Sequence, residues 1–92
     1  MPKVYKYDVP LQDEFELELP RDAEILSFQC QHDTPCIWAL VEPRNPPIKR
    51  RFRFSGTGHD ITQDPENLEF IGTAQMQGGM LIWHLFEITG GW

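Results

Sequence analysis

The stretch IKRRFRFSGTGHD, residues 48–60, holds the clearest structural pattern in the chain. Successive side chains on a β-strand point to opposite faces of the sheet. Phe52 and Phe54 are therefore expected on one face. Arg51 and Arg53 are expected on the other. The stretch predicts a strand with one apolar and one cationic face, which ends where two glycines follow.

A two-residue period extends from this strand to most of the chain. Residues 13–19 alternate apolar side chains with glutamates, and clusters of Gly, Pro, Asn and Asp separate the periodic segments. No apolar stripe with a helical period of useful length is present. The expected strands are Lys3–Val9, Asp13–Leu19, Ile25–Gln31, Cys36–Glu42, Ile48–Ser55, Leu68–Gln75 and Met80–Ile88.

Short strands with a turn about every ten residues are typical of an all-β protein. We therefore predict a small antiparallel β-sandwich or barrel of about seven short strands. A length of 92 residues is that of one domain, so residues 1–92 are expected to form a single β domain. On the strand 25–31, the alternation predicts that Leu26, Phe28 and Cys30 are buried.

Two expected strands, 36–42 and 80–88, are apolar on both faces. One face of each strand belongs to the core, and the other face needs a second cover, either a folded-over loop or another subunit. We expect a homodimer or a higher homo-oligomer on this basis. The strand order and the oligomeric state stay open.

The overall charge restricts the partners. A net charge of −6 argues against general nucleic-acid binding, which uses basic surface to replace counterions. No run of eighteen apolar residues is long enough to cross a membrane, and residues 1–5 lack the apolar stretch of a secretory signal. These features predict a cytoplasmic protein that does not interact with membranes.

The sharpest candidate site is the pair Arg51 and Arg53. By the rise of a strand their side chains lie about 7 Å apart, a spacing that suits a phosphate or carboxylate held by two guanidinium groups. The alternative is that they pair with Glu14, Glu16 and Glu18 on a neighbouring strand. The sequence does not decide between ligand binding and this internal pairing.

The loop after that strand, Gly56-Thr57-Gly58-His59, is the second candidate. A Gly-x-Gly turn lets backbone N–H groups approach an anion, and Thr57 and His59 can add hydrogen bonds. The loop lacks the Lys-Ser/Thr pair of a phosphate-binding loop, so a plain turn with positive φ is the alternative. Trp38 is the aromatic side chain expected to stack on a ligand base.

Metal binding and catalysis are not expected. The spacing of Cys30, His32 and Cys36 matches no common zinc motif. The two cysteines are expected to be reduced thiols, although the sequence leaves their redox state open. No spacing favours a thiol–imidazole pair with His59 or His84. We predict a protein that is not an enzyme, with no catalytic residues, no metal and no cofactor.

The chain also resembles a family of small, uncharacterised proteins of about 90 residues encoded by tailed phages and prophages. The resemblance covers nearly the whole chain in order. The segments that carry it are Val4–Tyr7, Glu18–Pro20, Ala23–Ser27, Pro35–Val41, Phe52, Gly56–His59, Phe70–Thr73, Gly78–Gly79 and Trp83–Glu87.

That family has no known function, so the resemblance implies a context and no chemistry. It implies a phage accessory protein in the host cytoplasm that acts by stoichiometric binding and counters a host defence system. The expected mechanism is sequestration of a small anionic, nucleotide-like ligand by Arg51, Arg53, the Gly56–His59 loop and Trp38. The alternatives are direct inhibition of a host protein, or a virion or morphogenesis component.

Overall fold

Strand β5 (Pro47–Gly56) has the two-sided pattern that the sequence predicts. Phe52 and Phe54 are buried on its inner face, while Arg51 and Arg53 lie on its outer face. The structure is a computed structural model that describes residues 1–91; Trp92 lies outside the described residues. The other strands are β1 (Lys3–Asp8), β2 (Glu14–Pro20), β3 (Glu24–Gln31), β4 (Thr34–Val41), β6 (Leu68–Met76) and β7 (Leu81–Ile88).

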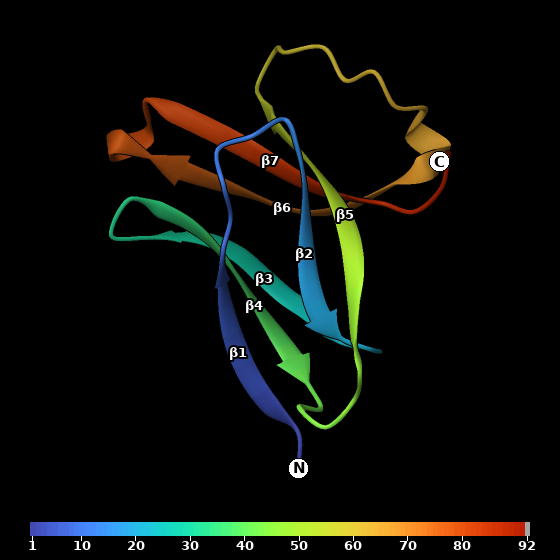
Figure 1. The fold of residues 1–92 in the computed structure, drawn as a ribbon. Coiled ribbons are helices and arrows are strands. Elements are labelled where there is room, and N and C mark those ends of the chain that lie inside the picture. Colours follow the sequence, from blue (N-terminus) through green and yellow to red (C-terminus); the bar gives the residue numbers. More distant parts are fainter. Residues whose placement is uncertain (92) are drawn as a thin grey trace.

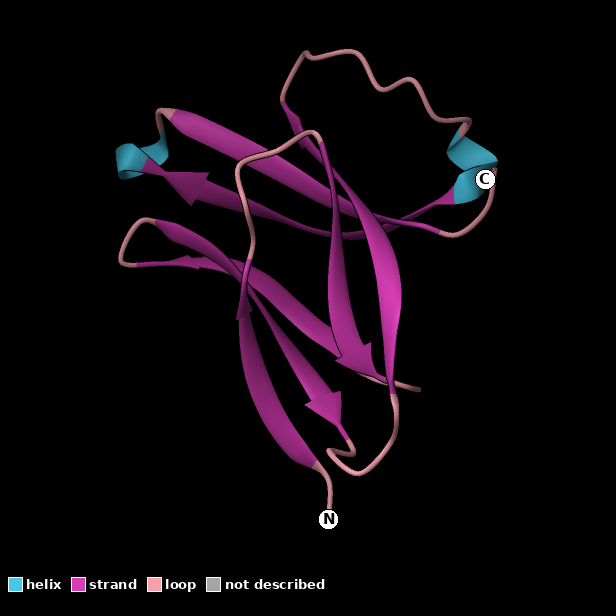
Figure 2. Cartoon of the chain, in the orientation of Figure 1, coloured by secondary structure: helices cyan, strands magenta, loops and turns pink. Residues whose placement is uncertain are grey.

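The seven strands form two antiparallel sheets that pack as a small all-β sandwich (Figures 1 and 2). One sheet has the order β1-β4-β3 and the other has the order β2-β5-β7-β6. The fold class and all seven strands that the sequence predicts are confirmed, with bounds that differ by one or two residues. Two single-turn 3-10 helices, η1 (Pro65–Asn67) and η2 (Gln77–Gly79), precede and follow β6.

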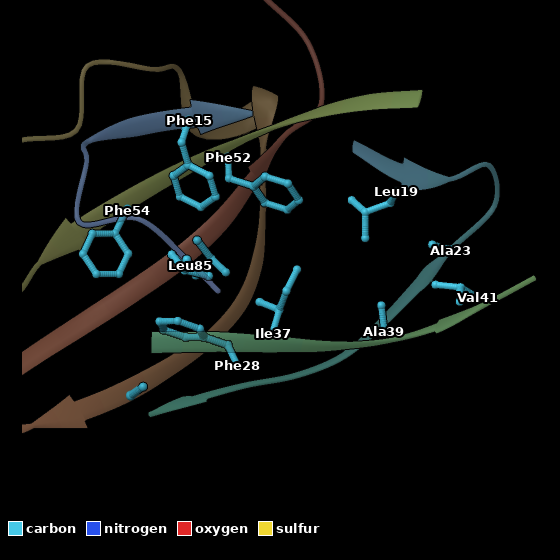
Figure 3. Packing of buried hydrophobic residues seen from close by; sticks show 12 residues of the cluster. Phe15, Leu19, Ala23, Phe28, Ile37, Ala39, Val41, Phe52, Phe54 and Leu85 are labelled. Atoms are coloured by element: carbon cyan, nitrogen blue, oxygen red, sulfur yellow. The ribbon is translucent and has the colours of Figure 1, made fainter. Parts of the chain in front are cut away.

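Apolar side chains from both sheets meet in one layer, as Figure 3 shows. Phe52 and Leu85 from the larger sheet face Ile37 from the smaller sheet, and each of these side chains has no exposed surface. Phe15 stacks on Phe52 with ring centroids 5.3 Å apart. Alternation along each strand is therefore what places this core.

Strand β3 departs from the expected alternation. A register shift between Ile25 and Ser27, opposite β4, marks a β-bulge. The extra residue reverses the sides to which the preceding side chains point. Ile25 therefore packs against the core, and Leu26 is 49% exposed. The prediction that Leu26 is buried is wrong for this reason, whereas Phe28 is buried and Cys30 is partly buried.

The two sheets also come close along one side, where β3 lies beside β6. A Cβ atom at Gly72 would lie 3.3 Å from the Cβ of Phe28, so a glycine permits this approach. At the same side, Asp33 in the β3–β4 turn accepts a hydrogen bond of 2.8 Å from the backbone N–H of Gln77. The hairpins β3–β4 and β6–β7 are thereby held tip to tip (Figure 1).

The connection from β5 to β6, residues 57–67, folds against the outer face of the larger sheet. Its contacts include a hydrogen bond from Gln63 Nε2 to Glu14 Oε1 of 2.7 Å and one from the Thr89 N–H to the Asn67 carbonyl of 2.7 Å. The loop therefore supplies part of the second cover that the two-sided strand β7 needs. On the outer face of β4, Leu40 is 39% exposed, so residues 1–91 do not cover this face completely.

Candidate anion-binding site

A ladder of opposite charges joins β2 and β5 on the outer face of the larger sheet. The register places Glu14 opposite Arg53, Glu16 opposite Arg51 and Glu18 opposite Lys49. Opposite charges at such positions attract each other and favour one register over its neighbours. The strand register therefore places Arg51 and Arg53 opposite glutamates, as the internal-pairing alternative requires.

Within this ladder the side chain of Arg51 is engaged. Its Nη2 lies 3.6 Å from Glu14 Oε1, and the two side chains are 37% and 48% exposed. A partly exposed pair of this kind contributes less than about 1 kcal/mol to stability. Arg51 thus belongs to the ladder, where it contacts the glutamate that lies opposite Arg53.

Arg50, on the inner face of the same strand, is fully committed to protein partners. Its Nε and Nη2 donate to the two carboxylate oxygens of Glu87 at 2.7 and 2.6 Å, and its Nη1 donates to the Ala23 carbonyl at 2.6 Å. The hydrogen bonds that Arg50 donates to the Glu87 carboxylate raise the pKa of Arg50. Two parallel bonds to one carboxylate are the strong form of this ion pair.

Arg53 has a different environment. It is only 7% exposed, and its Nη2 donates to the carbonyl of Asp60, in the loop above it, at 2.8 Å. Its buried Nε has no hydrogen-bond acceptor, and within residues 1–91 no carboxylate lies within ion-pairing distance of the guanidinium. Arg53 is therefore a buried cation with an unused donor.

A groove of about 310 Å³ lies on the same face of the sheet, and Arg53 is not among the residues that line it. Arg53 and Phe86 are directly opposite each other in the pairing of β5 with β7, and Phe86 forms part of the groove wall. The full lining is Ile61, Gln63, Pro65, Leu68, Phe70 and Phe86. Gln63 adds a second unused polar atom, because its buried Oε1 accepts no hydrogen bond.

The Gly56–His59 loop lines a separate cavity of about 270 Å³, together with residues 80–83. A Cβ atom at Gly56 would lie 2.8 Å from the exposed His59 ring and 3.2 Å from the Trp83 ring, so a larger residue there would have to displace the His59 side chain. Gly58 has a φ of 86°, which favours glycine for a conformational reason. The His59 ring meets the ring of Trp83 edge-on at 6.5 Å.

Thr57 connects this loop to the sheet through a histidine. Its Oγ1 lies 2.7 Å from His84 Nε2, while Thr73 Oγ1 lies 2.9 Å from His84 Nδ1. A neutral imidazole donates through one nitrogen and accepts through the other, so both ring nitrogens are satisfied. His84 therefore holds the start of the loop in place.

The predicted site residues do not all come together. Arg53 lies under the later part of the loop, Gly56, Thr57 and His59 line the second cavity, and Gly58 is at the exposed turn between them. Trp38 is on β4 in the other sheet. Gln63, Phe70 and Phe86 were not singled out from the sequence; the only signal was the two-sided apolar pattern of the last strand.

The thiols and the possible metal ligands are unremarkable. Burial raises the pKa of Cys30 and, with a hydrogen bond to Asp8, that of Cys36, so both remain protonated near neutral pH. In the described part of the chain both cysteines are free, and no three His, Cys, Asp or Glu side chains gather as a metal site. None of the described helices has the length and apolar character that crossing a membrane requires.

Comparison with known proteins gives one match. No curated protein and no solved structure is similar to the chain. A family described as a domain of unknown function, DUF7352, matches residues 1–90, which is nearly the whole chain. The chain therefore belongs to the DUF7352 family.

Proposed function

We propose that this protein is a non-catalytic binding protein that takes up a small anionic ligand at Arg53. The observation that carries the proposal is the guanidinium itself, which is buried, lacks a carboxylate partner among the described residues and keeps an unused Nε donor. An anion that reaches Nε supplies both the missing charge and the missing acceptor.

The burial of the Arg53 charge needs compensating interactions. Burying an ion costs several kcal/mol after relaxation unless an opposite charge and hydrogen bonds offset the cost. Arg50 shows this compensation, whereas Arg53 receives only one backbone carbonyl. Buried polar atoms without partners are uncommon in native proteins, and each one calls for an explanation such as a bound ion or ligand.

A binding role without catalysis agrees with the state of the two thiols, which lie in the other sheet. The raised pKa values of Cys30 and Cys36 disfavour the thiolate that nucleophilic attack needs. Both ring nitrogens of His84 lie within hydrogen-bond distance of threonine hydroxyls, which gives this histidine a structural role at the start of the loop. The chemistry that remains is recognition of charge and shape.

The biological setting of this proposal comes from the resemblance to small phage-encoded proteins. Stoichiometric sequestration of an anionic signal in the host cytoplasm is a way for such a protein to counter a host defence system. A ligand with a phosphate group suits the proposal, since phosphate oxygens accept charge-assisted hydrogen bonds from guanidinium groups.

Isothermal titration calorimetry with inorganic phosphate and with AMP tests the proposal. We expect one site per chain, and affinity at least about tenfold weaker in Arg53→Met, which keeps the volume of the side chain but removes the charge. Arg44→Met is the matched control, because the Arg44 side chain is 84% exposed. Equal binding by the Arg53→Met and Arg44→Met variants would reject the site.

Self-association is a second candidate, and a separate surface favours it. The outer face of the three-stranded sheet exposes Val4 (55%), Leu26 (49%) and Leu40 (39%) around the half-buried Trp38. A second copy of the chain is the occupant that the sequence analysis expects there. Light scattering at increasing concentration is expected to show a dimer that Leu40→Asp dissociates, and a monomer at every concentration would exclude the second copy.

A further inference from the structure

Strand β1 is an edge of the smaller sheet, and within residues 1–91 no strand pairs with its outer side (Figure 1). The N–H of Val9, directly after β1, donates to the Pro35 carbonyl at 2.9 Å, and β1 pairs with β4 along its whole length without a register shift. Successive residues of a strand direct their backbone groups to opposite sides. The odd-numbered residues of β1 therefore bond to β4, while the backbone N–H and C=O groups of Val4, Lys6 and Asp8 point away from the sheet.

The side chains of β1 leave this edge unprotected. Natural edge strands are commonly blocked by lysine side chains, prolines or β-bulges, which keep a further strand from pairing. The ammonium group of Lys6 instead crosses β4 and donates to Gln31 Oε1 of β3 at 2.8 Å. Residues 3–8 contain no proline, and their pairing with β4 has no bulge. The outward N–H groups of β1 are thus accessible to an extended chain.

The charges of the edge strands indicate which kind of chain fits β1. Strand β1 carries two lysines and one aspartate, whereas β2, the edge of the larger sheet, carries three glutamates. The remaining edge strands, β3 and β6, lie beside each other where the two sheets approach. Opposite charges attract, so an acidic segment is favoured at β1 over β2.

Tyr5 adds apolar surface at the same edge. It lies opposite Ala39, which is fully buried, so the Tyr5 side chain is on the core-facing side of the sheet. Its ring is nevertheless 39% exposed and meets the Tyr7 ring at 6.5 Å. An apolar side chain directly opposite Tyr5 on an added antiparallel strand would have its Cβ about 5 Å from the Tyr5 Cβ. Such a side chain would cover the exposed part of the ring, which is favourable.

We propose that the β1 edge binds an extended acidic segment of a partner protein by β-strand addition. The added strand pairs antiparallel with β1 and bonds to the backbone groups of Val4, Lys6 and Asp8. An acidic side chain of the segment faces Lys6, and an apolar one faces Tyr5. The backbone bonds supply affinity, and the alternation of acidic and apolar side chains supplies selectivity. The edge belongs to the other sheet from Arg53, so this inference does not depend on anion binding.

Amide hydrogen exchange of the full chain, followed by NMR, tests the proposal with the peptide Thr-Val-Glu-Val-Thr-Glu. In the antiparallel register its first Glu lies opposite Lys6 and its second Val opposite Tyr5. At saturating peptide we expect exchange at the N–H groups of Val4, Lys6 and Asp8 to slow at least about fivefold. Exchange at Tyr5, whose N–H already bonds to β4, is expected to change less than about twofold. The charge-reversed peptide Thr-Val-Lys-Val-Thr-Lys is expected to bind about tenfold more weakly.

A proline substitution separates the backbone contribution from the side chains. Lys6→Pro removes one outward N–H and no bond to β4, so we expect it to weaken the peptide at least about tenfold. Lys6→Thr, which keeps the N–H, is expected to weaken it less. Glu16→Pro is the matched control on the β2 edge and is expected to bind the peptide unchanged. Its N–H also points outward, because the bond from the Phe54 N–H to the Asp13 carbonyl directs the odd-numbered residues of β2 toward β5.

Several results would overturn the proposal. These are absence of peptide binding at millimolar concentration, equal binding by Lys6→Pro and Glu16→Pro, and slowed exchange on β2 in place of β1. Slowed exchange on β1 that grows with protein concentration, without any peptide, would assign the edge to a second copy of the chain and would also overturn it. The exchange measurement uses the unmodified chain, so its result does not depend on whether Lys6→Pro folds.

Discussion

Arg50 and Arg53 lie three residues apart on one strand, and their environments are opposite. Arg50 donates to both oxygens of Glu87 and to the Ala23 carbonyl, so the protein itself supplies its counter-charge. Arg53 is more deeply buried and donates to one carbonyl only. The hydrogen-bond donors of Arg50 are satisfied by the protein, whereas the Nε donor of Arg53 has no acceptor among residues 1–91.

The difference follows from the face on which each side chain lies. Arg50 is on the inner face near the end of the sandwich, where Glu87 of β7 points toward it. Arg53 is on the outer face, where the loop 57–67 covers it and where Glu14 turns to Gln63 and Arg51. On one strand, the protein therefore supplies a carboxylate to the arginine on the inner face, whereas among residues 1–91 it supplies none to Arg53 on the outer face.

The largest expected effect is on stability, in the variant Arg50→Met. It leaves the partly buried Glu87 carboxylate without its partner, so we expect the free energy of unfolding to fall by about 3 kcal/mol. Urea denaturation followed by circular dichroism measures this loss. Arg44→Met, at an exposed position, is expected to stay within about 0.5 kcal/mol of the unmodified chain. A loss below about 1 kcal/mol in Arg50→Met would remove the contrast between the two arginines.

Arg53→Met is expected to change stability much less. The substitution removes the hydrogen bond to the Asp60 carbonyl, which costs stability, but it also removes a buried charge with little compensation, which adds stability. These two effects are expected to offset each other, because methionine is an apolar side chain of similar length. We expect the free energy of unfolding to change by less than about 1 kcal/mol in either direction. A loss as large as that of Arg50→Met, in the same urea measurement, would mean that Arg53 is a structural residue like Arg50.

A smaller effect is expected from the charge opposite Arg53. Glu14→Gln removes a negative charge from beside the site, so phosphate is expected to bind about two- to threefold more tightly. Glu18→Gln is the matched control, because Glu18 lies opposite Lys49 in the same ladder, four residues further along β2. Calorimetry that finds equal affinity in the two variants would show that the anion binds away from Arg53.

The fold was predictable from the sequence because one rule acts at nearly every position. Alternation of side chains gives the seven strands and the inner face of β5. The opposition of glutamates to cations between β2 and β5 stayed one of two alternatives, because alternation does not contain the strand order. The rule fails at Leu26, where a β-bulge adds one residue to the strand. The sequence does not mark this bulge, because Ile25 and Leu26 are both apolar and either one could face the core.

The site was predictable only in part. Alternation places Arg51 and Arg53 on one face, but it cannot show which arginine meets a carboxylate, because that depends on the path of the loop 57–67. The position of Trp38 in the other sheet depends on strand order, which short-range patterns do not contain. Gln63 and Phe70 join the site through tertiary packing, so the residues next to them in sequence give no signal.

The most direct measurement is a ¹H–¹⁵N NMR titration of the arginine Nε–H groups with inorganic phosphate, with the Arg53 signal assigned through Arg53→Met. Saturable movement of the Arg53 signal is expected, while the Arg50 signal stays in place because Glu87 already occupies its Nε. An Arg53 signal that does not move, or one that moves no more than the Arg50 signal, would contradict the assignment of Arg53 as the anion-binding residue.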